Sequence, residues 1–316
     1  MILRILQRLA VLVGSLAVSS VVVFGFMAVL PGNPARVALG VNASDSAVTQ
    51  MEQEFGLDRS LIDQYFGWVG GLLTFDPGES YVSRALIGPQ ITDRLQVTLL
   101  LVGVAMALAV VVAVPLGTTI AVRHRKLSGL ALSAVSQVGV AVPAFLAGIL
   151  LITLFAVQFP FLPANGWTPP AEDPVMFLKQ LLLPALSLGI VQAAVLTRYV
   201  RSAVLEVLQE DYLRTARAKG LRPMPALVRH GLRNAAVPVV TVLGLQLATL
   251  LVGAVVVERV FVIPGIGSLL LDSVSNRDLI VVQDVVMILV VAVLVVNFLI
   301  DLLYLAIDPR LRAESR

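Results

Sequence analysis

Long apolar runs alternate with short polar segments along this chain. A helix of about 20 mostly apolar residues spans a bilayer. Five runs contain no charged residue: Leu9–Leu30, Leu95–Val122, Gln180–Thr197, Asn234–Val257 and Val285–Ile300. A sixth run, Leu127–Ala171, is also uncharged but is interrupted by Pro143, Pro160 and Pro163.

This pattern predicts an all-α, polytopic membrane protein with six transmembrane helices. In the third helix, Pro143 indicates either a kink or two separate pieces, 130–142 and 144–158, because proline breaks the helical hydrogen-bond pattern. The six predicted spans lie near residues 9–30, 95–122, 130–157, 178–202, 235–257 and 285–307.

The composition agrees with a membrane protein. Hydrophobic residues make up 58% of the 316 residues and charged residues only 14%, and the mean hydropathy is +0.93. A soluble domain of this size could not cover itself with so little polar surface. Cysteine is absent, which excludes disulfides, thiolate metal sites and cysteine nucleophiles.

The positive charges predict the orientation, because cytoplasmic loops are enriched in Lys and Arg. Sixteen of the 23 Lys and Arg residues fall on one side of the predicted spans, which places both termini and the 206–233 loop in the cytoplasm. A signal peptide over residues 1–30 is the weaker alternative, because the apolar run is too long and no small-residue cleavage site follows it. The seven residues on the other side are Arg36, Arg59, Arg84, Arg94, Lys179, Arg259 and Arg277.

Residues 31–94 form the largest predicted external segment. Ser44 and Asp45 predict the start of a helix that Gly56 ends, and Asp58 is expected to cap a second helix over 59–73. The segment is either a small cap on the membrane surface or a contact surface for a substrate-delivering protein, and the two are compatible. Two further loops are predicted at 159–177, which is proline-rich, and at 258–284, where Pro264, Gly265 and Gly267 favour a sharp turn.

The cytoplasmic 206–233 loop carries helix start and stop signals. Asp211 favours a helix N-terminus, and Arg217 and Lys219 fall where the helix dipole favours cations. Gly220 is expected to take the left-handed conformation that ends a helix. Pro223 and Pro225 can open another helix, which leads to Pro238 and the fifth span. Such a rigid helix could transmit a push from a soluble partner; a solvated basic loop that serves only orientation is the alternative.

The stretch Asp211–Gly220 resembles the "EAA" loop of ATP-binding-cassette (ABC) importer permeases, and more closely the family that transports dipeptides, oligopeptides and nickel chelates. The resemblance covers nearly the whole chain. Its other motifs are Leu30–Pro34, Gly56–Asp58, Gln64–Tyr65, Pro143–Phe145, Leu183–Gly189, His230, Asn234–Pro238, Gly253–Glu258, Phe261, Pro264–Gly267, Asn297, Asp301, Tyr304 and Asp308–Arg310.

Three features depart from the general pattern of these permeases. Arg214, Thr215 and Ala216 stand where the general loop has Glu-Ala-Ala, and the distance from Gly220 to Pro238 is longer. Both of these are similar to the peptide-permease variant. Asp76–Gly78 replaces a Gly-Asp-Leu-Gly motif and leaves the structure of the external loop open.

The resemblance implies a type I ABC importer permease fold and a peptide cargo, with nickel chelates or glutathione as alternatives, in the bacterial cytoplasmic membrane. It implies a first span with an external segment over 1–94, a permease core over 95–307 with its coupling loop at 203–234, and a tail over 308–316. The implied partners are a second permease subunit, two ATPases that bind ATP and Mg, an extracytoplasmic substrate-binding lipoprotein and membrane lipid, without nucleic acid. The implied ATPase contacts are Asp211, Tyr212, Arg214, Thr215, Ala216, Lys219 and Gly220.

Acids near or within the spans are candidates for the pathway or its gate. Asp301 lies one helical turn after Asn297 in the sixth span, as half of a structural ion pair or as a proton relay. Glu258 ends the fifth span, and either pairs with Arg259 or Arg277 or lines the mouth of the pathway. The candidate pathway or gate residues are Glu258, Pro264, Gly265, Asn297 and Asp301.

The chain lacks the motifs of an enzyme. None of its three lysines, Lys126, Lys179 and Lys219, lies in a phosphate-binding Gly-x-x-x-x-Gly-Lys-Ser/Thr loop. His124 and His230 do not form a His-Glu-x-x-His zinc motif. We therefore expect no catalytic residue, cofactor or metal in this chain. An ion-coupled secondary transporter and a membrane scaffold without transport are the functions of other classes that remain open.

Overall fold

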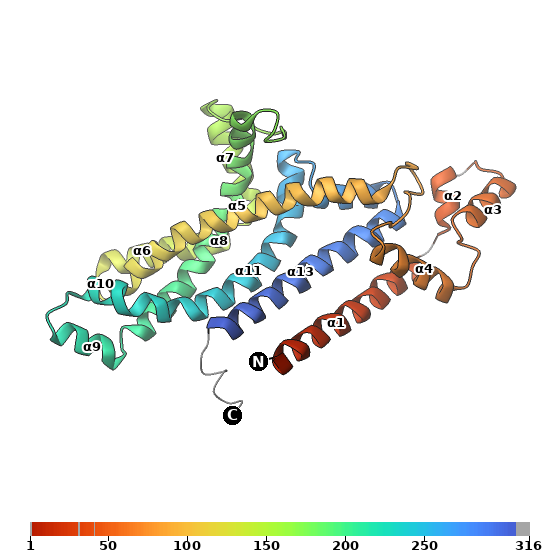
Figure 1. Cartoon of the computed structure of the whole chain (residues 1–316). Helices are drawn as coiled ribbons and strands as arrows, with labels where there is room; N and C mark the ends of the chain where they lie inside the picture. Colours follow the sequence, from red (N-terminus) through yellow and green to blue (C-terminus); the bar gives the residue numbers. More distant parts are fainter. Residues whose placement is uncertain (1, 31, 41, 308–316) are drawn as a thin grey trace. The chain divides into compact units, whose positions relative to one another are not determined.

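The computed structural model describes residues 2–30, 32–40 and 42–307, and Figure 1 shows its helices. Pro31 of the Leu30–Pro34 motif, the Asp308–Arg310 motif and the 308–316 tail lie outside these residues. The described residues are almost all helical and contain no strand, only an isolated bridge between Glu79 and Leu86. The all-α prediction is therefore confirmed.

The chain divides into two compact units, which we describe separately. Within the described residues, the core unit consists of 2–5, 99–263 and 296–307. The cap unit consists of Leu6–Thr98 and Pro264–Val295.

Among the described residues, five helices are each long and apolar enough to cross a membrane, and a bent helix pair makes a sixth candidate. They begin three to eight residues before the predicted spans, because flanking polar residues continue a helix beyond its apolar run. The multi-span prediction is thus confirmed. The five helices are α1 (Ile2–Val29), α5 (Ile87–Val122), α8 (Pro174–Val207), α11 (Leu232–Phe261) and α13 (Leu279–Ile307).

The third predicted span consists of two pieces. Helix α6 (Leu127–Ala141) and helix α7 (Ala144–Ile152), which a π-helical turn η1 (Thr153–Gln158) continues, meet at an angle of 98°. Val142 between them is extended, with φ −85° and ψ 121°. The residue before a proline avoids the helical region, so Pro143 places the break where the sequence predicts it.

The cap unit contains three short helices between α1 and α5. They are α2 (Pro34–Leu39), α3 (Asp45–Glu54) and α4 (Leu61–Leu73). Ser44 caps α3 as predicted, through a bond to the Ala47 N–H. The prediction that Asp58 caps the next helix is wrong. Ser60 caps it, because the Ser60 hydroxyl accepts from the Asp63 N–H and donates to the Asp63 carboxylate in a reciprocal arrangement.

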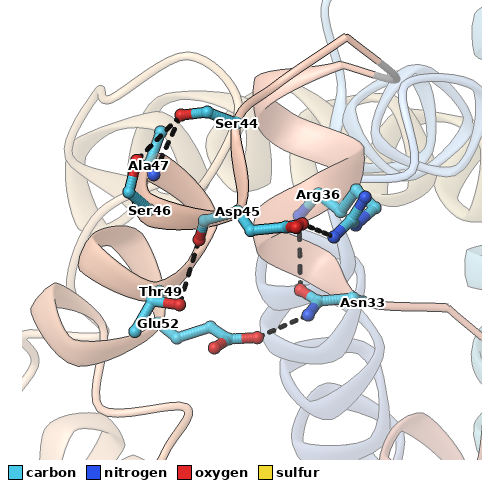
Figure 2. A network of polar contacts seen from close by, with 8 residues as sticks. All are labelled: Asn33, Arg36, Ser44, Asp45, Ser46, Ala47, Thr49 and Glu52. Carbon is cyan, nitrogen blue, oxygen red and sulfur yellow. Dashed lines mark hydrogen bonds and ion pairs between the residues drawn. The ribbon is translucent and has the colours of Figure 1, made fainter.

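Figure 2 shows the polar contacts that fasten α2 to α3. The Asn33 side chain accepts from the N–H groups of Ala35 and Arg36, which caps α2, and its amide donates to Glu52 on α3. Arg36 forms an ion pair of 2.6 Å with Asp45. Because both partners of this pair are exposed, it contributes little, and the hydrogen bond from the Asn33 amide to Glu52 is the firmer polar link between α2 and α3. The sequence did not predict α2.

Helix α12 (Ile266–Ser275) occupies the segment that the sequence predicts as a loop. The predicted sharp turn is present before it, where Val262 is left-handed with φ 52°. The N–H of Ile266, at the start of α12, donates to the Thr98 hydroxyl at 2.9 Å. The apolar face of α12 packs in the cap unit. Ile266 and Leu269 on this face lie in one buried cluster with Ile87, Ile91, Val281 and Val285. The helix is too short for the apolar-run criterion, which explains why it was missed.

Helix α8 is the centre of the core unit and packs against α6, α7 and α11. Small residues allow this close packing, as in other membrane helix bundles. A Cβ atom on Gly117 of α5 would lie 2.8 Å from the Thr197 carbonyl oxygen on α8. A Cβ on Gly139 of α6 would lie 2.9 Å from the Ala194 Cβ. The helices therefore meet almost backbone to backbone.

We expect Gly117→Ala to destabilise the protein by about 1–3 kcal/mol, since the added methyl must displace the α8 backbone. The matched control is Gly103→Ala on the same helix, where nothing lies within 4 Å of the added Cβ. Thermal unfolding in detergent should show a lower Tm for the first variant and an unchanged or higher Tm for the second. Equal Tm values for the two variants would contradict the close approach.

Candidate functional site

A short helix, α9 (Asp211–Ala218), follows α8 in the core unit. Asp211 lies in its first turn and Arg217 in its last turn, as the sequence predicts. Helix α8 ends at Val207, so residues 206 and 207 belong to the span and not to the short helix. The exposed part of the loop is therefore shorter than the predicted 206–220 segment.

The C-terminus of α9 is fixed by a left-handed glycine. Gly220 has φ +92°, its N–H donates to the Arg217 carbonyl at 2.9 Å, and the Leu221 N–H donates to the Ala216 carbonyl at 3.3 Å. This pair of bonds is a Schellman motif. The predicted stop at Gly220 is confirmed, and the motif gives α9 a defined end.

A single buried side chain anchors α9 to the rest of the core unit. Leu213 is 2% exposed and belongs to an apolar cluster with residues of α5, α8 and α11. Gly231 leaves the space for it, since a Cβ there would lie 3.3 Å from Leu213 Cδ1 and 2.9 Å from Val207 Cγ1. Neither Leu213 nor Gly231 was predicted as a functional residue from the sequence. The sequence signal for Leu213 is that an aliphatic residue lies between Tyr212 and Arg214 in a polar segment, which indicates a buried position.

The rest of α9 faces outward. The Tyr212 hydroxyl accepts a hydrogen bond from Asn234 Nδ2 at 2.9 Å, which orients the ring. Arg214 lies 3.3 Å from Asp211, but both side chains are mostly exposed and the pair is weak. Ala216 is half-buried. The exposed members of the predicted contact set are Asp211, Tyr212, Arg214, Thr215, Lys219 and Gly220. The helix is thus a rigid, anchored element whose polar face is free to contact another molecule.

From α10 onward, the chain runs into the fifth span without a break. Pro223 and Pro225 lie in a single helical turn, α10 (Pro223–Ala226), as predicted. A π-helical turn, η2 (Leu227–Gly231), joins it to α11. Helix α11 continues through Pro238, so α10, η2 and the fifth span form one continuous helical element.

The candidate pathway residues lie at three places. Glu258 is fully buried in the last turn of α11. Pro264 and Gly265 precede α12 in the cap unit, and Gly265 has extended backbone geometry. Asn297 and Asp301 are half-buried on α13 in the core unit. Their pathway roles stay predictions. In the described part of the chain, no group of three Asp, Glu or His side chains could hold a metal ion.

Known proteins are similar to this chain in sequence. Residues 113–313 match the family described as "Binding-protein-dependent transport system inner membrane component", and residues 1–102 match its N-terminal companion family. The chain is 38% identical over 311 residues to the "Glutathione transport system permease protein GsiC" of Escherichia coli K12, with 98% of both chains covered. It is 39% identical over 307 residues to the protein of that name from Pectobacterium atrosepticum, with 97% of this chain and 98% of that one covered.

A solved structure shows the same fold at lower sequence identity. An inward-facing form of the MetNI methionine ABC transporter aligns with a TM-score of 0.58 and 20% identity, covering 69% of this chain and 96% of that one. At this identity the likeness concerns the fold alone.

Proposed function

Because this chain belongs to the family of binding-protein-dependent transport system inner membrane components, we propose that its cargo is a short peptide, with glutathione as the first candidate. The chain is an ABC importer permease and a multi-pass protein of the bacterial inner membrane. The 38% identity to glutathione permeases across 98% of both chains supports the cargo. Glutathione is itself a tripeptide, so the predicted peptide cargo and the relatives' cargo belong to one chemical class. A nickel chelate is the alternative.

The permease works with ATPases and an extracytoplasmic substrate-binding protein, as its family implies. In our proposal a second permease subunit completes the pathway, and each permease contacts one of two ATPases, which bind ATP and Mg. The contact on this chain is the exposed face of α9, on the side that the positive charges predict to be cytoplasmic. Leu213 and the continuous η2–α11 segment would pass a movement of α9 into the fifth span. Glu258, Pro264, Gly265, Asn297 and Asp301 are proposed to line or gate the pathway.

Transport by the complete complex tests the cargo. Proteoliposomes containing the permeases, the ATPases and the cognate binding protein are supplied with ATP and either labelled glutathione, a labelled dipeptide or a labelled nickel chelate. We expect ATP-dependent uptake of glutathione or of the dipeptide. Uptake of the nickel chelate alone would overturn the peptide cargo and leave the permease assignment in place. Uptake driven by an ion gradient without ATP would instead favour the secondary-transporter alternative.

Crosslinking tests the contact surface independently of the cargo. The natural chain has no cysteine, so a single introduced thiol reports on one position. We expect Thr215→Cys on the exposed face of α9 to crosslink to the ATPase in the assembled complex. The matched control is Thr241→Cys, on an exposed position of α11 within the span. No ATPase adduct at residue 215, with intact assembly, would contradict the proposed contact.

A further inference from the structure

Two buried aspartates lie at the start of α13 in the cap unit. Asp278 immediately precedes the helix and is 5% exposed, and Asp284 lies within it and is 0% exposed. Asp284 is ~8 Å along the helix from its first residue, at a rise of about 1.5 Å per residue. The transport mechanism proposed above uses neither of them.

Each carboxylate accepts one hydrogen bond from a neutral donor. Trp68 Nε1 on α4 donates to Asp284 Oδ1 at 2.7 Å. The Ser80 hydroxyl donates to Asp278 Oδ2, while it accepts from the N–H groups of Val82 and Ser83. Its single proton is therefore committed to Asp278. The remaining oxygens, Asp278 Oδ1 and Asp284 Oδ2, are buried and have no hydrogen-bond partner within the described structure.

The Tyr81 hydroxyl interacts electrostatically with both Asp284 and Asp278. Burial, together with the negative charges of Asp284 and Asp278, raises the pKa of Tyr81 to about 12. Its hydroxyl therefore keeps its proton at physiological pH and adds no charge. Its ring packs on Phe55, with the centroids 4.6 Å apart.

No base in the described residues neutralises the pair. Arg84, on the same loop as Tyr81, is engaged elsewhere: it pairs with Glu54 at 2.8 Å and lies over the Phe55 ring. Neither carboxylate forms an ion pair among the described side chains. The other ionisable groups on the elements around the pair are Asp63 and Tyr65 on α4, Asp76 and Glu79 before Ser80, Asp93 and Arg94 on α5, and Asp272 and Arg277 on and after α12.

Two uncompensated negative charges in such a setting are unstable. Burying an ionised carboxylate without a partner is so costly that the group takes up a proton instead, and a second like charge nearby adds to the cost. A single proton solves both problems, because it removes one charge and supplies a donor for a bare oxygen. We propose that Asp278 and Asp284 form a proton-binding site that holds one proton at neutral pH.

The bound proton would hold three elements of the cap unit together. Trp68 belongs to α4, Ser80 and Tyr81 to the loop before α5, and Asp284 to α13. Loss of the proton would leave two buried charges among these elements, and the contacts between them would loosen. The site thus makes the cap unit sensitive to an alkaline shift.

Infrared spectroscopy of the full chain in lipid nanodiscs detects the proton directly. We expect a protonated carboxyl C=O band at pH 7 that disappears on titration to higher pH. Asp284→Asn should remove it, while Asp93→Asn, at an exposed acid on α5, should leave it. A wild-type spectrum without this band at pH 7 overturns the proposal, and it remains decisive even if a variant fails to fold.

Thermal unfolding provides a second, independent test. An aspartate in an unfolded chain titrates at about 3.9, so at neutral pH the folded state binds a proton that the unfolded state has released. The contribution of this site to stability must then fall as pH rises above about 4, so stability should fall less with rising pH in Asp284→Asn than in Asp93→Asn. Equal slopes would overturn the proposal. A wild-type Tm at pH 7 that falls with EDTA and recovers with Ca²⁺, but not in Asp284→Asn, would also overturn it, because a metal ion would then occupy the pair.

Discussion

Leu213→Asp is expected to abolish uptake while the chain still inserts into the membrane. Leu213 is the buried residue of α9 and is 2% exposed. Truncating a buried leucine costs about 2–5 kcal/mol, and an aspartate adds the cost of a charge in an apolar cluster. Helix α9 should therefore detach from the core unit, and the proposed contact with the ATPase should be lost.

The measurements are ATP-dependent uptake and co-purification of the ATPase with the tagged permease. The matched control is Val228→Asp, which introduces the same charge at a side chain that is 58% exposed. We expect at least a tenfold loss of uptake for Leu213→Asp and a small effect for the control. If Leu213→Asp retained both ATPase binding and uptake, the anchoring role of this residue would be wrong.

The second large effect is expected at the end of the same helix, for Gly220→Val. Gly220 has φ +92°, and a left-handed conformation costs an L-residue about 1–2 kcal/mol, with β-branched residues at the unfavourable end. No atom lies within 4 Å of the added Cβ, so the cost arises in the backbone alone. We expect a five- to thirtyfold loss of the correctly ended helix, as about 1–2 kcal/mol implies, and a parallel loss of ATPase-coupled uptake.

Gly220→Asn separates this backbone effect from the loss of a glycine. Asparagine tolerates the left-handed region better than other non-glycine residues, so this variant should retain more uptake than Gly220→Val. Membrane insertion, measured by protease accessibility, should be equal for both. Normal uptake by the valine variant would count against a role of the helix end in coupling.

The spans could be predicted well from the sequence, because an uncharged apolar run of membrane length is rarely anything but a transmembrane helix. Pro143 also marked the break in the third span, although only the structure showed that the two pieces meet at 98°. Helices α2 and α12 were missed for a physical reason. Each has at most 10 residues, and tertiary contacts stabilise such short helices more than their own pattern does.

The ends of α9 were predictable because capping is local. Asp211 and Gly220 act within one turn of the helix, so their roles can be read from neighbouring residues. The anchor was not predictable in the same way, since Leu213 and Gly231 are brought together by folding. The misassigned cap of α4 shows the limit of local reasoning, because Asp58 and Ser60 are both good capping residues and only geometry selects Ser60.

The buried aspartates could not be predicted from the sequence, because they belong to no motif. The last uncharged run begins at Val285, one residue after Asp284, so the sequence predicts the acid to lie outside the span. The structure begins α13 at Leu279 and places Asp284 within it. Its partner Trp68 is 216 residues away in sequence, and Ser80 is 198 residues away from Asp278. No local pattern carries that information.

The crowding around α8 has a consequence for how this protein can diverge. Gly117, Gly139 and Gly189 each leave at most 3.1 Å between a hypothetical methyl group and the facing helix. Mutational drift should therefore be slow along this seam. Substitutions that change side-chain volume are expected to accumulate instead at open positions, such as Leu245, Val252 and Val256 on α11, which are 61%, 69% and 47% exposed.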